Sequence, residues 1–145
     1  MKKGSFFREN QEARVAGNNR FSRKEKLKGR DEIREVFSRK KGVSCPGARL
    51  LILRNALPYN RIAFTFSRKY GNAVERNHSR RLSREVYRLL RNELQKGYDL
   101  VLQVYPGRDV YSARTNQLRE LFSRAGLFIS SPNGPKYPDD QELKQ

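Results

Sequence analysis

A basic stretch at residues 67–94 carries the side chains with the clearest chemistry in this sequence. It reads SRKYGNAVERNHSRRLSREVYRLLRNEL and holds eight Arg and Lys between positions 68 and 91, against two acids, Glu75 and Glu85. Asn72 followed three residues later by Glu75 is typical of a capping box, so we expect a helix to begin there. Gly97 is the expected C-terminal stop. Arginine guanidinium groups suit phosphate oxygens and base edges, so the stretch predicts contact with a polyanion.

The basic stretch predicts an amphipathic helix with one cationic face. At about 100° per residue, the expected apolar stripe consists of Leu82, Val86, Leu89, Leu90 and Leu94. The opposite face consists of Asn77, Arg80, Arg81, Arg84, Arg88 and Arg91, with Arg76 at the border. A solvated helix face is the alternative interpretation, but such a face normally mixes charge signs. Since Glu85 is the only acid between positions 77 and 91, the pattern favours a nucleic-acid surface.

The overall composition points to the same partner class. The 145 residues suggest one domain, with 32 Lys and Arg against 15 Asp and Glu and a formal net charge of +17. A membrane surface is the other anionic candidate, but no apolar run approaches the roughly 20 residues of a spanning helix. The charged N-terminus lacks an apolar signal region, so we expect no signal peptide. A single cysteine, Cys45, excludes an internal disulfide framework and fits a cytoplasmic location.

The inventory of catalytic side chains is poor. The chain has one histidine, His78, and one cysteine, with no Cys/His cluster at zinc spacing and no phosphate-binding glycine loop. Its acids are scattered, whereas a metal-dependent nuclease needs carboxylates that converge on divalent ions. We therefore expect no catalytic residue and no metal site on this chain. His78 is expected to be a polar surface residue.

Composition divides the chain into a folded domain with two extensions. We expect residues 1–19 to be a flexible basic extension and residues 130–145, with three prolines, to be a disordered tail. The single RNA-binding domain then covers residues 20–129.

Apolar periodicity within the domain predicts the order helix, strand, strand, helix, strand, helix. Ile33, Val36 and Phe37 form the stripe of the first helix, which Gly42 should end. The predicted strands cover residues 49–54, 61–67 and 98–105. In the last helix, Ser112 is the expected cap and Gly126 the expected end, around a buried stripe of Leu118, Leu121, Phe122 and Ala125. This order indicates an α+β fold, a mixed two-layer α/β sandwich.

Residues 61–85 resemble the signature of the bacterial ribonuclease P protein component. They read RIAFTFSRKYGNAVERNHSRRLSRE, which is similar to the family's strand, basic turn, Gly-Asn-Ala-Val and Arg-Asn-x-x-(Lys/Arg)-Arg-x-x-Arg motif. RFSRKEKLKGRDEIREVF at residues 20–37 resembles its N-terminal segment. The resemblance covers about residues 20–128. It implies a mixed sheet of about four strands with three helices, resembling the second domain of ribosomal protein S5. It also implies a left-handed β-α-β crossover, although about 98% of such connections are right-handed.

The resemblance also implies a function. Members of the family join a large catalytic RNA, one protein per RNA, in removing the 5′ leader from precursor tRNA. Hydrolysis would then be carried by the RNA subunit and depend on Mg²⁺ held mainly by that RNA. The expected partners are therefore the catalytic RNA and precursor tRNA.

The motif match assigns roles residue by residue. The signature helix supplies the expected contacts to the catalytic RNA, namely Arg76, Asn77, Arg80, Arg81 and Arg84, with Arg88 one turn further on. Arg68 and Lys69 match the basic pair before the turn. By the same resemblance, the positions of the family's leader-binding cleft correspond to Ile33, Phe37 and Leu53 in this sequence. Ile33 and Leu53 stand where the family has aromatic residues, and an aliphatic side chain offers contact area without a π-face.

Two other functions compete with this one. A ribosome-associated or assembly RNA-binding protein would use the same basic face without supporting cleavage. A protein-only nuclease would cleave RNA by itself with divalent ions. Identifying the RNA that co-purifies with the chain would distinguish a ribonuclease P subunit from a ribosome-associated or assembly protein.

Overall fold

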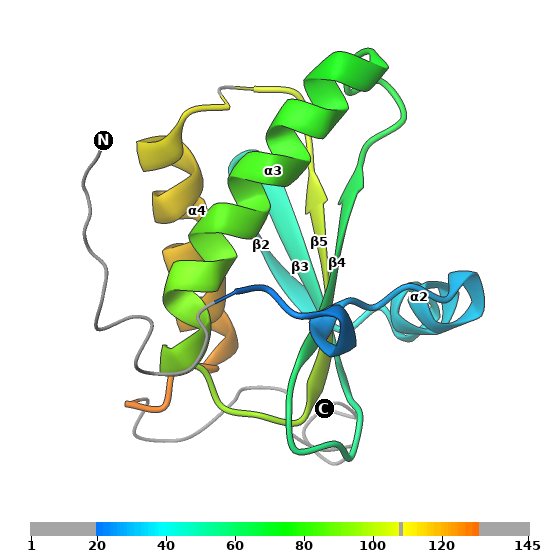
Figure 1. The fold of residues 1–145 in the computed structure, drawn as a ribbon, viewed down its shortest axis with the longest axis vertical. Coiled ribbons are helices and arrows are strands. Elements are labelled where there is room, and N and C mark those ends of the chain that lie inside the picture. Colours follow the sequence, from blue (N-terminus) through cyan, green and yellow to red (C-terminus); the bar gives the residue numbers. More distant parts are fainter. Residues whose placement is uncertain (1–19, 108, 131–145) are drawn as a thin grey trace.

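The computed structural model describes residues 20–107 and 109–130 (Figure 1). The predicted basic extension, and all but the first residue of the predicted tail, lie outside this part. In chain order the elements are η1 (Arg23–Glu25), α2 (Arg30–Arg39), β2 (Gly42–Cys45), β3 (Ala48–Arg54), β4 (Arg61–Phe66), α3 (Ala73–Leu90), η2 (Arg91–Glu93), β5 (Tyr98–Val104) and α4 (Tyr111–Ala125). The three predicted strands and the three predicted helices are all present.

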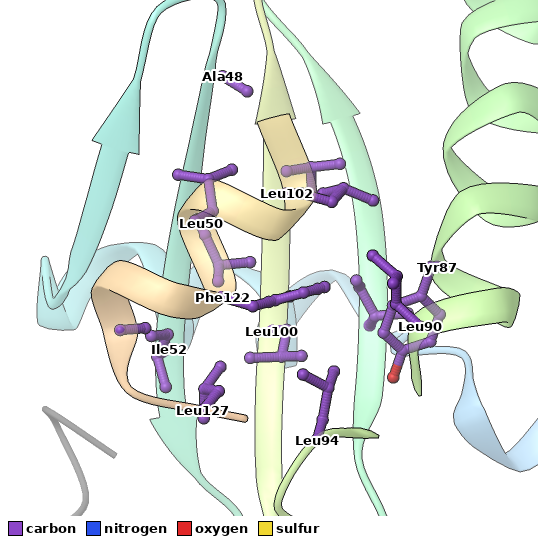
Figure 2. Close-up of a cluster of buried hydrophobic side chains, with 14 of the residues drawn as sticks. Ala48, Leu50, Ile52, Tyr87, Leu90, Leu94, Leu100, Leu102, Phe122 and Leu127 are labelled. Atoms are coloured by element: carbon purple, nitrogen blue, oxygen red, sulfur yellow. The ribbon is translucent and has the colours of Figure 1, made fainter. Parts of the chain in front are cut away.

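The strands form one mixed sheet in the order β2-β3-β5-β4. β3 is antiparallel to β2 and β5, whereas β4 runs parallel to β5 with Ile62 opposite Leu100. Figure 2 looks at the sheet from the side of α4, with β4 and β5 both pointing up and β5 to the left of β4. Because α3 connects them on that side, the crossover is left-handed. The mixed sheet of four strands with three helices is confirmed.

Helices cover both faces of the sheet, with α3 and α4 on one side and α2 on the other (Figure 1). The main core lies under α3 and α4, where Leu50, Ile52 and Leu100 from the sheet pack with Tyr87 and Phe122 from the helices (Figure 2). The smaller core lies under α2 and consists of Leu27, Val36, Leu51, Ala63 and Val101. Successive strand residues point to opposite faces, so the unbroken apolar run of β3 supplies both cores.

The first strand, β2, was not predicted from the sequence. Gly42 begins this strand and does not end the preceding helix, which stops at Arg39 with Lys40 in the left-handed conformation (φ 54°). Gly42 lies so close to β3 that a Cβ atom there would clash with the Leu50 carbonyl oxygen. Four residues at a sheet edge are too few to show an alternating pattern, which explains the omission.

The buried face of α3 differs from the predicted apolar stripe. Leu82 is only half-buried and Leu89 is 45% exposed. The buried residues of the helix are Ser79, Ser83, Val86, Tyr87 and Leu90. Val86, Leu90 and Leu94 of the predicted stripe are thus buried, but Leu82 and Leu89 are not. Ser79 and Ser83 can face the core because Arg114 of α4 donates to both hydroxyls.

Two predicted helix ends also need correction. α3 ends at Leu90 and passes into η2, so Gly97 (φ 104°) lies in the turn before β5 and is not the stop of that helix. α4 begins at Tyr111 with Val110 as its N-cap, so Ser112 lies inside the helix. The Val110 carbonyl already accepts the Arg114 backbone N–H at 3.0 Å, which starts the helix without a side-chain cap. The end at Gly126 (φ 71°) and the predicted stripe of α4 are confirmed.

Candidate nucleic-acid interface

A tight turn between β4 and α3 presents the predicted basic pair. Arg68 and Lys69 are both exposed, and the Tyr70 backbone N–H closes the turn on the Ser67 carbonyl at 3.0 Å. α3 then begins with the expected capping box: the Glu75 N–H donates to the Asn72 side chain at 2.9 Å, and the Asn72 N–H donates to the Glu75 carboxylate at 3.0 Å. The start of α3 is therefore fixed, and with it the direction of the side chains that follow.

The predicted cationic face is present on α3, but its members differ in how free they are. Arg81 is exposed and makes no side-chain hydrogen bond within residues 20–107 and 109–130. Arg80 donates to the Asn77 side-chain oxygen at 3.0 Å. Arg88 donates to both oxygens of Glu85, at 3.2 and 2.6 Å, and this bonding raises the pKa of its guanidinium. Arg88 is therefore paired with an acid of its own helix, unlike Arg81.

Arg91 does not belong to this face. Its side chain is buried and donates to both carboxylate oxygens of Glu25, at 2.8 and 2.6 Å. The reason is the change from α3 to the tighter η2 at this residue, which the uniform rotation of about 100° per residue does not include. The assignment of Arg91 to the exposed face was wrong, and its role is to join the end of α3 to η1.

Aromatic rings lie beneath two of the signature arginines. The guanidinium carbon of Arg80 is 5.1 Å from the ring centre of Phe66, and that of Arg84 is 5.9 Å from the ring centre of Phe21. Both distances are within the range of cation–π attraction. The rings hold the two guanidinium groups beside β4. The Nε of Arg84 is buried without a hydrogen-bond partner among the described residues. Arg76 differs, since it donates to the Arg68 carbonyl at 3.1 Å and so ties α3 to the basic turn.

A groove of about 220 Å³ runs between α3, β4 and the segment before α2. Its lining combines cations with apolar and aromatic side chains: Phe21, Lys26, Leu27, Lys28, Ile33, Ile62, Ala63, Phe64, Thr65, Arg80 and Arg84. β4 is an edge strand, and its outer edge is bridged by the segment before α2, where the Leu27 N–H donates to the Ile62 carbonyl at 3.0 Å. Proteins that bind single-stranded nucleic acid combine a positively charged groove with aromatic side chains on which the bases stack.

The three residues predicted for the leader cleft lie together on the α2 side of the sheet. Ile33, Phe37 and Leu53 are half-buried and pack around the smaller core. Only Ile33 also lines the groove. The structure therefore brings the three together but places Phe37 and Leu53 outside the groove as it stands.

The aromatic residues at the groove were not predicted from the sequence. Phe64 lines the groove, and it and Phe66 are only half-buried because β4 is an edge strand, although both pack against the main core. Phe21 was not singled out at all. The sequence feature that could have indicated these rings is the alternation of large and small residues in β4, directly before a cationic helix.

A polar cluster between α3 and α4 was also missed. Arg114 of α4 is buried and donates to Ser79 at 3.2 Å, to Ser83, and to Asp109, with which it forms an ion pair. Asp109 also accepts the hydroxyl of Tyr70, whose pKa is raised by burial and by this bond. The cluster connects the buried side of α3 to the residue that closes the basic turn. The only signs of this cluster in the sequence are two serines four positions apart, Ser79 and Ser83, and an arginine, Arg114, in the following helix.

Other candidate chemistry is sparse in the part of the chain that the structure describes. No group of three His, Cys, Asp or Glu there could hold a metal ion, and no helix there is long and apolar enough to cross a bilayer. His78 is exposed, as predicted, with its ring nitrogen 3.4 Å from the Asp109 carbonyl oxygen. Burial raises the pKa of the half-buried Cys45 thiol, so the neutral form is favoured.

Comparison with known proteins identifies the family. The family model described as Ribonuclease P matches residues 21–126. The ribonuclease P protein component of Gluconacetobacter diazotrophicus is 40% identical over 112 residues, covering 72% of this chain and 94% of the relative. That of Thermoanaerobacter sp. is 32% identical over 109 residues, covering 73% and 93%. The solved RNase P protein from Thermotoga maritima superposes with a TM-score of 0.57 at 26% identity, covering 69% of this chain and 96% of that one. The fold, the basic helix and these relatives together show that the chain belongs to the bacterial ribonuclease P protein family.

Proposed function

We propose that this chain is the protein subunit of a cytoplasmic ribonuclease P. In this role it binds one catalytic RNA and the 5′ leader of precursor tRNA, and so supports maturation of the tRNA 5′ end. The observation that carries the proposal is the arginine face of α3 beside a groove lined by cations and aromatic rings. Membership of the family supplies the identity of the RNA.

The two parts of the site perform different tasks. Arg68, Lys69 and Arg81 offer exposed charges that contact the phosphates of structured RNA and fix its position. Arg80 and Arg84 lie over rings at the groove, where a cation and a π-face together suit an unpaired nucleotide. The arginine face is thus assigned to the catalytic RNA and the groove to the leader, with Ile33, Phe37 and Leu53 extending the leader contact across α2.

The proposal places the chemical step on the RNA subunit. The described residues bring together no carboxylate set for Mg²⁺, so we assign the ion to the RNA and derive no step through it on this chain. The protein's contribution is to bind and orient the two RNAs and to offset their charge repulsion.

The first test concerns activity. The protein free of RNA should cleave no precursor tRNA, whereas addition to its cognate catalytic RNA should raise processing at low Mg²⁺. Processing is followed as release of the labelled leader. Cleavage by rigorously RNA-free protein would indicate a protein-only nuclease. Binding without any gain in processing would favour the ribosome-associated or assembly protein.

The second test concerns the arginine face. Arg81→Ala should weaken binding to the catalytic RNA and flatten the slope of log K against log[salt] by roughly one unit, because one phosphate contact is lost. Thermal stability should not change, since this side chain is exposed and has no side-chain partner in the described part of the chain. The control is Arg119→Ala, which removes an exposed arginine from α4. Equal slopes for the two variants would contradict a phosphate contact at Arg81.

A further inference from the structure

A second concave site lies at the opposite end of α3 from the signature motif. It has a volume of about 210 Å³ and is bounded by η1, the turn before β4, and η2. Its lining residues are Lys24, Glu25, Tyr59, Asn60, Tyr87, Arg91, Asn92 and Lys96. At a rise of about 1.5 Å per residue, it is some 20 Å along the helix from Asn77, and none of the roles assigned above uses it.

The charge of this pocket is unbalanced. Its one carboxylate, Glu25, is already occupied, since it accepts from Arg91 and, at 2.8 Å, from the Ser22 hydroxyl. Lys24 and Lys96 then have no carboxylate partner among residues 20–107 and 109–130. Two ammonium groups at the mouth of a concave site concentrate a positive potential there, which attracts an anion.

An aromatic ring lies beside these charges. The Lys24 ammonium is 4.8 Å from the ring centre of Tyr59, which is half-buried. Asn60 next to it is locked in place, donating to the Gln95 carbonyl and accepting the Tyr98 N–H, both at 2.8 Å. A fixed backbone therefore holds the ring at the pocket.

The pocket continues the pattern of the groove. Cations pair with aromatic rings at three places along β4: Arg80 with Phe66 at its end, Arg84 with Phe21 beside its middle, and Lys24 with Tyr59 before its start. The ring of Phe21, which lines the groove, is 5.9 Å from the ring of Tyr87, which lines the pocket, so the two sites adjoin. Repeated pairs of a cation and an aromatic ring along one path suit a single strand, because each nucleotide offers a phosphate to the cation and a base to the ring.

We propose that this pocket is a further subsite for single-stranded RNA, in which Lys24 and Lys96 contact a phosphate and Tyr59 contacts a base. The proposal rests on the RNA-binding function proposed above and extends its path beyond the groove. The strand belongs either to the precursor leader or to an unpaired segment of the catalytic RNA.

The test compares two double variants of the full chain with the same change in charge. Lys24→Gln/Lys96→Gln removes the pocket cations, and Lys40→Gln/Arg119→Gln removes two exposed cations that line neither site. Affinity is measured as a function of salt for three probes: the cognate catalytic RNA, and the reconstituted complex with precursor and with mature tRNA. For a single strand, loss of one phosphate contact should flatten the salt slope by about 0.7 units in the pocket variant alone.

The three probes identify the source of the strand. A loss confined to precursor tRNA assigns the pocket to the leader, and a loss on the catalytic RNA alone assigns it to that subunit; both results support the subsite. If the pocket variant matches the control on every probe while Arg81→Ala still loses affinity, the subsite is refuted and the proposed function stands. If Arg81→Ala also has no effect on any RNA, the proposed function and the subsite are both refuted.

Discussion

Replacing Arg114 with Met should lower the free energy of unfolding by about 3 to 5 kcal/mol, the usual cost of removing one partner of a buried ion pair. The Arg114 side chain is 1% exposed and pairs with Asp109, which is itself mostly buried. Methionine fills much of the space but leaves the Asp109 carboxylate without its cation and the hydroxyls of Ser79 and Ser83 without their donor. Urea denaturation with matched slopes measures the loss.

The control is an exposed ion pair on the same helix. Arg124 donates to Glu120 at 2.7 Å, with side chains 56% and 42% exposed, so Arg124→Met should cost at most about 1 kcal/mol. Adding Asp109→Asn to Arg114→Met should recover part of the loss, because a neutral amide is cheaper to bury than an unpaired charge. A cost for Arg114→Met no larger than that for Arg124→Met would contradict the stabilising role of the cluster.

Most of the fold could be predicted because its elements follow simple periodicity. The strands around Ile52, Ile62 and Leu100 are bounded by glycine or proline and read correctly to within one or two residues. The capping box at Asn72 and the αL glycine at Gly126 fixed two helix ends by local chemistry. β2 was not predicted because its pairing with β3 depends on a close approach of the two backbones at Gly42. No side-chain pattern in the sequence indicates that approach.

The rotation of α3 could not be predicted from hydrophobicity. Leucines at 82 and 89 looked like core, but the partner helix supplies Arg114, which makes Ser79 and Ser83 the residues that face inward. Which side of a helix is buried depends on what it packs against, and that partner lies about 30 residues further along the chain. This difference between the predicted and the observed buried face does not move the arginine face out of solvent, because that face spans a wide arc of the helix.

The candidate site was predictable in its charges and less so in its aromatic residues. The cationic residues from Arg68 to Arg84 follow from composition and the family motif alone. The rings beneath them come from Phe21 and Phe66, which are far apart in sequence. Phe21 reaches β4, 6.2 Å from the ring of Phe64, only because the chain before α2 crosses the outer edge of this strand. No local pattern encodes that crossing.

Phe37→Leu should separate the stability of α2 from its contact with the leader. Leucine keeps most of the apolar volume, so the free energy of unfolding should fall by less than about 1.5 kcal/mol. If the exposed side of the ring stacks on an unpaired base, its loss should weaken the preference for precursor over mature tRNA by about 1 to 3 kcal/mol. The two affinities are measured in the reconstituted complex, with thermal melting of the protein alongside.

The matched control for this experiment is Phe128→Leu. Phe128 is also half-buried, but it packs against Phe122 in the main core, on the other side of the sheet from α2. It should therefore lose similar stability without changing the precursor preference. If Phe37→Leu destabilises the protein yet leaves the preference equal to that of Phe128→Leu, Phe37 belongs to the smaller core alone. The leader would then be restricted to the groove beneath Arg80 and Arg84, where rings are already present and Ile33 reaches the lining without a π-face.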